Sequence, residues 1–173
     1  MSNIILIGMP SSGKSTVGIL LAKNLGFEFI DSDLLIQKKT GKLLHQTISE
    51  SGIDYFLETE NEVNSSISAE NTVISTGGSA VYCQKAMEHL ASIGLVIYLK
   101  ISFETLCERL GDYVHRGVII KNGCTLRDMY EERSVLYEKY ADIVIDESEC
   151  GTSLSSTVEC TLNACKKYLQ CDM

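Results

Sequence analysis

The residues best suited to chemistry lie near the N-terminus, in a glycine-rich stretch that ends in lysine and serine. Gly8, Gly13, Lys14 and Ser15 fit the pattern G-x-x-x-x-G-K-[ST], in which loop amides surround phosphate groups. In such a loop we expect Lys14 to reach the β- and γ-phosphates and the Ser15 hydroxyl to bind Mg²⁺. The residues expected around the phosphates are Gly8, Ser11, Ser12, Gly13, Lys14, Ser15 and Thr16.

The segments on either side of this stretch support a phosphate-binding loop. The apolar run Ile4–Ile7 is long enough for a short buried strand, and Val17, Leu20, Leu21 and Leu25 recur at helical spacing afterwards. The order strand, loop, helix places the loop amides and the positive end of the helix dipole at one point, where they favour an anion. A plain glycine turn is the alternative, but it does not require this context. The pattern therefore predicts a nucleotide-phosphate site.

Two carboxylates follow the second predicted strand, as Asp31 and Asp33. On an extended chain they would point the same way, because strand side chains alternate. One could hold Mg²⁺ through its waters, and the other could accept the proton of an attacking hydroxyl. The alternative is a solvated strand end or a helix N-cap, since Asp and Ser are good caps.

A glycine pair and three arginines complete the candidates. Gly77 and Gly78 follow the third predicted strand, where they could admit a ligand close to the backbone or simply form a turn. Arg109, Arg116 and Arg133 could stack on a base, clamp a transferring phosphoryl group or fork onto a carboxylate. For any one arginine, a solvated surface position is the alternative.

The elements that must position these residues read as one α/β domain over residues 1–173. Short apolar strands alternate with segments of helical pattern, which is typical of a doubly wound, three-layer parallel sheet whose ligands bind at the carboxyl ends of its strands. The polar stretch 112–123 reads as a loop able to close over a nucleotide. The segment from Ser148 turns weakly helical, and we assign it no chemistry. The expected strands are Ile4–Ile7, Phe27–Ile30, Thr72–Ser75, Leu95–Leu99 and Ile143–Ile145.

Composition excludes several classes of protein. The net charge is −8, from 15 basic and 23 acidic residues, which argues against a nucleic-acid surface. No apolar run approaches the roughly 20 residues that a membrane span needs. The seven cysteines include no C-x-x-C pair, and no signal peptide precedes the first strand, so we expect free thiols in a cytoplasmic protein.

Taken together and in order, these residues resemble the shikimate kinases, small P-loop kinases of the nucleoside-monophosphate-kinase type. The resemblance extends through Asp146. Its further motifs are Phe29-Ile30-Asp31-Ser32-Asp33, Thr40-Gly41-Lys42, Tyr55-Phe56 with Glu60, Ser75-Thr76-Gly77-Gly78-Ser79-Ala80-Val81, Tyr98-Leu99, Glu108-Arg109-Leu110, and Arg133 through Asp146.

The resemblance implies five parallel strands, a mobile lid at about residues 111–124 and a substrate-binding helical segment at about 33–62. It implies Mg²⁺ and ATP, and phosphorylation of shikimate to shikimate 3-phosphate, a step of aromatic amino acid biosynthesis, by a monomer. Asp31 would serve the hydrated Mg²⁺ and Asp33 would deprotonate the acceptor hydroxyl. Arg109 would pack on adenine, Arg116 would face the phosphates from the lid, and Arg133 would bind the substrate carboxylate. Gly77 and Gly78 would lie against the substrate ring, and Leu57 and Ser79 would be further substrate-binding positions.

The sequence departs from the family pattern on the acceptor side. Leu57, within Phe56-Leu57-Glu58-Thr59-Glu60, stands where the family has an arginine that helps to bind the acid's carboxylate. The third glycine of the triple-glycine turn is Ser79, and the lid's Arg-Pro-Leu-Leu is Arg116-Gly117-Val118-Ile119. Losing one charge-assisted contact costs about 1.5–3 kcal/mol. The alternatives are therefore a kinase of the same fold that acts on another hydroxylated metabolite, or a nucleotide-binding module without catalysis.

Overall fold

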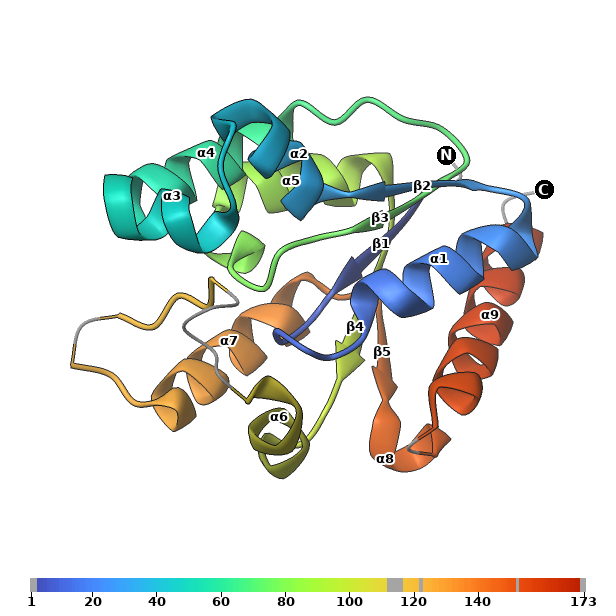
Figure 1. Ribbon diagram of the computed structural model, residues 1–173. Helices are drawn as coiled ribbons and strands as arrows, with labels where there is room; N and C mark the ends of the chain where they lie inside the picture. Colours follow the sequence, from blue (N-terminus) through green and yellow to red (C-terminus); the bar gives the residue numbers. More distant parts are fainter. Residues whose placement is uncertain (1–2, 112–116, 122, 152, 172–173) are drawn as a thin grey trace.

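The computed structural model describes residues 3–111, 117–121, 123–151 and 153–171. Its centre is a sheet of five parallel strands, as the sequence predicts, and the strand order is β2-β3-β1-β4-β5 (Figure 1). The strands are β1 (Asn3–Ile7), β2 (Glu28–Asp31), β3 (Thr72–Ser75), β4 (Gly94–Lys100) and β5 (Ile143–Asp146). The helices are α1 (Lys14–Leu25), α2 (Ser32–Thr40), α3 (Leu44–Ser51), α4 (Ile53–Ser65), the short 3₁₀ turn η1 (Ala80–Tyr82), α5 (Gln84–Ile93), α6 (Phe103–Leu110), α7 (Leu126–Tyr140), α8 (Glu147–Cys150) and α9 (Leu154–Cys171).

Both faces of the sheet are covered, which explains why its central strands are apolar throughout. Along β1, Ile4 and Leu6 face one core while Ile5 and Ile7 face the other, as the two-residue period of a strand requires. The core that holds Ile4 and Leu6 lies under α1 and α9; the opposite core lies under α5, α6 and α7. The strands thus form the middle of three layers.

Helices α2, α3 and α4 form a group beside the β2 edge of the sheet, at the top of Figure 1. They have a small core of their own, which contains Ile36, Phe56 and Val63. Ile119, from the segment predicted as a lid, packs into that same core, and Gly117 lies against Leu44 of α3. The described part of the lid segment therefore contacts the helical group predicted to bind substrate.

Two details of the sequence prediction need correction. The side chains of Asp31 and Asp33 do not share one extended segment, because the chain turns into α2 at Ser32. Asp31 is the N-cap of that helix, and its Oδ1 accepts from the Asp33 backbone N–H at 3.0 Å. The C-terminal segment, predicted to be weakly helical, is the 18-residue helix α9, which packs against α1.

Two statements about composition can be compared with the structure. The six cysteines whose side chains are described are free thiols. Among the described residues, no helix is both long enough and apolar enough to cross a membrane.

Candidate active site

The loop between β1 and α1 has the backbone geometry of a phosphate-binding loop. Gly8, Ser11 and Gly13 adopt positive φ angles of 148°, 61° and 89°. Alternation of such residues with ordinary ones turns successive N–H groups toward one concavity, which favours an anion. Gly8 is required sterically as well, because a Cβ there would stand 2.6 Å from the Leu99 carbonyl oxygen at the end of β4. Gly13 is the N-cap of α1, so the loop lies at a helix N-terminus.

Lys14 lies over this loop. Its side chain is buried, and Nζ donates to the carbonyl oxygens of Gly8 at 2.9 Å and Met9 at 2.8 Å. Burial lowers the pKa of Lys14 to about 8, and the carboxylates of Asp33 and Asp31 oppose that shift. The ammonium therefore lies beside the loop whose N–H groups favour an anion.

Ser15 and Asp31 form a pair of oxygen ligands suited to a hard cation. The Ser15 hydroxyl donates to Asp31 Oδ2 at 2.7 Å and lies 3.3 Å from the Ser75 hydroxyl. Mg²⁺ prefers oxygen ligands, keeps several waters and binds through one or two protein groups together with phosphates. Within the described residues no cluster of three or more His, Cys, Asp or Glu side chains could hold a metal. The hydroxyl–carboxylate pair therefore fits a metal that arrives with a nucleotide.

Asp33 points into the cavity from the first turn of α2. Burial raises the pKa of Asp33 to about 6, and the nearby charge of Asp31 raises it further, while Lys14 acts in the opposite direction. A carboxylate with a pKa near neutrality is well matched to accept a proton from a hydroxyl.

The turn after β3 carries the acceptor side of the cavity. A Cβ on Gly77 would stand 2.8 Å from Asp33 Oδ1 and closer still to Glu60 Oε1, and one on Gly78 would stand 2.9 Å from Pro10 Cδ. Both glycines therefore let neighbouring side chains approach the backbone, and they form the turn that was one of the two interpretations of this pair. Tyr137 fixes the turn, since its hydroxyl donates to the Gly78 carbonyl oxygen at 2.6 Å.

Arg133 is almost fully buried, at 1% exposure, on α7. Its Nη2 donates to the Ile119 carbonyl oxygen at 2.7 Å and its Nε donates to the Tyr82 hydroxyl at 3.3 Å. Its Nη1 lies 3.2 Å from the position of a Cβ on Gly78. These contacts fix the plane of the guanidinium beside the turn, so it is not one of the solvated surface arginines.

One cavity of about 260 Å³ unites most of the predicted residues. The phosphate loop forms one end, and the turn after β3, α4 and Arg133 form the other. The predicted residues in its wall are Ser11, Gly13, Lys14, Ser15, Thr16, Asp33, Gly77, Gly78, Ser79 and Arg133.

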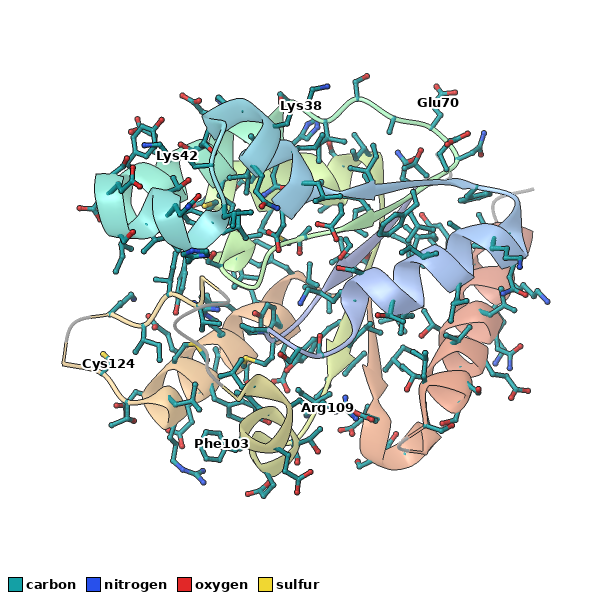
Figure 2. The ribbon with its side chains drawn as sticks, viewed as in Figure 1. Lys38, Lys42, Glu70, Phe103, Arg109 and Cys124 are labelled. Carbon is teal, nitrogen blue, oxygen red and sulfur yellow. The ribbon has the colours of Figure 1, made fainter. Side chains whose placement is uncertain are left out.

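Other predicted residues lie outside this wall. Gly8 and Ser12 belong to the loop but do not line the cavity, and Asp31 reaches the site through Ser15. Leu57 does not line the cavity; it packs against the small core of the helical group. Arg109 pairs with Glu147 of α8 through two hydrogen bonds, one of them 3.0 Å long, and Figure 2 shows it between α6 and α8. Arg116 lies outside the described residues.

The sequence reasoning missed Glu60 as a site residue. This carboxyl is fully buried on α4, lines the cavity and accepts a hydrogen bond from the Ser79 hydroxyl at 2.6 Å. Burial raises the pKa of Glu60 to about 7. Its motif position beside Phe56 was visible in the sequence, but its burial and its bond to Ser79 are tertiary facts.

The comparisons with known proteins agree with this geometry. A model of the shikimate kinase family matches residues 10–162. A shikimate kinase of Clostridium botulinum is 38% identical over 97% of this chain and 98% of its own length. The structure of shikimate kinase from Acinetobacter baumannii in complex with shikimate superimposes with a TM-score of 0.79 at 31% identity, covering 98% of this chain and 92% of that one. That of Aquifex aeolicus gives 0.81 at 33%, covering 96% and 98%. The chain belongs to the shikimate kinase family, a family of phosphotransferases.

Proposed function

We propose that this protein transfers the γ-phosphoryl group of ATP to a hydroxyl of shikimate, giving ADP, shikimate 3-phosphate and a proton. The observation that carries the proposal is the single cavity in which the phosphate loop, Asp33 and Arg133 meet. A loop for an anion, a base and a fixed guanidinium are the groups needed to hold a nucleotide phosphate in line with the hydroxyl of an acid.

On the nucleotide side, the loop amides and Lys14 would hold the β- and γ-phosphates. Ser15 and Asp31 would hold Mg²⁺, which when bound neutralises charge on the phosphate oxygens. Arg109, already oriented by Glu147, would pack on the adenine, and Arg116 would approach the phosphates from the lid. Lys14 would thus stabilise charge on the transferring group, where fixed electrostatic groups are most effective.

On the acceptor side, Asp33 would orient the hydroxyl and accept its proton during transfer. Arg133 would bind the acceptor's carboxylate, since its guanidinium is fixed beside the Gly77–Gly78 turn. The ring of the acceptor would lie against these glycines. Closure of the lid segment, about 111–124, would exclude water and so prevent hydrolysis of ATP.

A coupled assay of ADP release over a panel of hydroxy acids and polyols tests the proposal. Shikimate should give a saturable signal well above the rate with ATP alone. Shikimate is not the acceptor if it releases no more ADP than buffer while another compound gives a saturable rate of ADP release. That result would support the second candidate function, in which an enzyme of the same fold phosphorylates another hydroxylated metabolite. Leu57 and Ser79, which replace family residues on the acceptor side, are the observation that favours it.

A further inference from the structure

Glu60 presents one carboxyl oxygen that the protein itself does not satisfy. Oε2 accepts from the Ser79 hydroxyl at 2.6 Å, whereas Oε1 is buried and has no hydrogen-bond partner among the described residues. Buried polar atoms in folded proteins are almost always hydrogen-bonded, so an unpaired one in the wall of a binding cavity points to a ligand. The side chain is fully buried, and Glu60 is one of the residues that line the cavity.

The free oxygen lies among the groups that face the acceptor. A Cβ on Gly77 would stand closer than 3.0 Å to both Glu60 Oε1 and Asp33 Oδ1, so both oxygens lie on one side of that glycine. On the next residue of the turn, Arg133 Nη1 lies 3.2 Å from the position of a Cβ on Gly78. An acceptor held between Asp33 and Arg133 would therefore lie beside Glu60.

Burial, more than the charges around it, raises the pKa of Glu60 toward neutrality. The groups that face it are Asp33 from α2, Lys14 from α1, Arg133 from α7 and the Cys83 thiol after η1. Burial raises the pKa of Glu60 to about 7 and the charge of Asp33 adds to this, while the Ser79 hydrogen bond and the two cations oppose it. One helical turn earlier, Leu57 offers no cation, since it packs in the small apolar core. A carboxylate brought beside Glu60 would favour the neutral form further.

We propose that Glu60 is a specificity residue that meets the acceptor as a neutral carboxylic acid: Ser79 holds its Oε2, and its Oε1–H donates a hydrogen bond to the acceptor's carboxylate. The proposal rests on the proposed function. The family's arginine at position 57 is absent from this chain, and a carboxylic acid is a second kind of group that can donate to a carboxylate. An O–H···O⁻ hydrogen bond is charge-assisted and therefore strong. Ser79 then acts directly, by holding Oε2, and Leu57 acts indirectly, because it leaves this region without the family's arginine.

The pH dependence of the Michaelis constant for shikimate tests this assignment. With a pKa near 7, about nine tenths of Glu60 is neutral at pH 6 and about one tenth at pH 8, while the acceptor's own carboxyl stays ionised. The KM of the wild-type enzyme should rise several-fold across that interval at saturating Mg-ATP. Glu60→Gln should keep the low KM at both pH values, because the Ser79 hydroxyl can donate to the amide oxygen and the amide N–H can replace the acid proton. Glu58→Gln, on the exposed face of the same helix, is the charge-matched control and should behave as wild type.

Two outcomes overturn the proposal while leaving the proposed function intact. One is a wild-type KM that is flat from pH 6 to pH 8. The other is a KM that falls as the pH rises together with a large loss of affinity in Glu60→Gln, which would mean that Glu60 acts as an anion. Calorimetry of shikimate binding at the same two pH values distinguishes these outcomes from failure of the proposed function. Wild-type protein that neither binds nor phosphorylates shikimate would overturn both the proposed function and the role of Glu60.

Infrared difference spectra of wild type against Glu60→Gln provide a readout that needs no acceptor. They should contain the C=O band of a protonated, buried carboxyl at pH 6, and the band should weaken by pH 8. Absence of that band at pH 6 would show that Glu60 is ionised and would overturn the assignment, whatever the kinetics.

Discussion

The two ends of the cavity are built in different ways. The phosphate loop at the nucleotide end comes from one continuous stretch, residues 8–16, whose shape is set by local backbone geometry at the start of α1. The acceptor end is assembled from α2, α4, the turn after β3 and α7, and is held by long-range bonds such as those from Ser79 to Glu60 and from Tyr137 to Gly78. The nucleotide end retains the full family pattern, whereas the acceptor end carries the substitutions.

The largest effect should come from the nucleotide end. Lys14→Ala removes the one buried ammonium over the loop, and we expect kcat/KM for ATP to fall by about 10³-fold, the upper range for loss of one transition-state donor. Steady-state kinetics at fixed shikimate measure this. Lys23→Ala, on the exposed face of α1, is the control and should retain wild-type activity. If kcat/KM for ATP in Lys14→Ala stayed within fivefold of wild type, Lys14 and its loop would not contribute to catalysis.

Asp33 joins the two ends, and its replacement separates binding from chemistry. In Asp33→Asn we expect kcat to fall by at least about 10²-fold, because the proton of the hydroxyl loses its acceptor, while Mg-ADP affinity stays within a few-fold. Single-turnover kinetics and ADP calorimetry measure the two quantities. Asp54→Asn, exposed on α4, is the matched control. Undiminished turnover in Asp33→Asn would exclude it as the base.

The third prediction concerns stability, and it distinguishes the buried acceptor end from the rest of the molecule. Glu60 has a raised folded pKa, so the native state binds more protons than the unfolded state between its ordinary pKa and about pH 7, and stability falls as the pH rises through that interval. Glu60→Gln has no carboxyl at this position, so its stability should not show this fall. The unfolding free energy of Glu60→Gln minus that of wild type should therefore increase by roughly 2 kcal/mol from about pH 5 to pH 8. Urea unfolding at the two pH values checks this, and an equal difference at both would contradict it.

The smallest effect should follow from a change of donor geometry in the acceptor end. Arg133→Lys keeps the charge but loses the fork that binds a carboxylate and the Ile119 carbonyl oxygen, so the KM for shikimate should rise about tenfold with little change in the KM for ATP. The exposed Arg127→Lys on the same helix is the control. Equal increases in the KM for shikimate and the KM for ATP would show that Arg133 stabilises the fold and does not bind the acceptor.

Sequence reasoning succeeded where local pattern determines geometry. The phosphate loop, the five parallel strands and the convergence of Asp33 and Gly77 follow from motif spacing and from the rule that parallel strands present their carboxyl ends at one edge, whereas Arg133 was placed there by the family resemblance. It failed where geometry depends on contacts distant in sequence. The Asp31–Asp33 spacing was interpreted as strand alternation, although Asp31 caps α2. Glu60 was overlooked because nothing local shows that its carboxyl is buried against Ser79.

The same limit explains Leu57. Its place in the motif predicted a position in the substrate site, yet its side chain packs into the core that holds Phe56 and Ile119, outside the cavity wall. An apolar residue on a half-buried helix gains more from that core than from a polar cavity. Position in a motif therefore located the backbone correctly but not the side chain.

In the proposed reaction, the γ-phosphoryl group of ATP is transferred to a hydroxyl of an acid held between Asp33 and Arg133. Phosphorus NMR of wild-type protein with Mg-ATP and shikimate tests it most directly, because it identifies every phosphorus-containing product. The account predicts ADP and a phosphate monoester of shikimate in equal amounts, with little inorganic phosphate. Formation of ADP with an equal amount of inorganic phosphate and no monoester would contradict it.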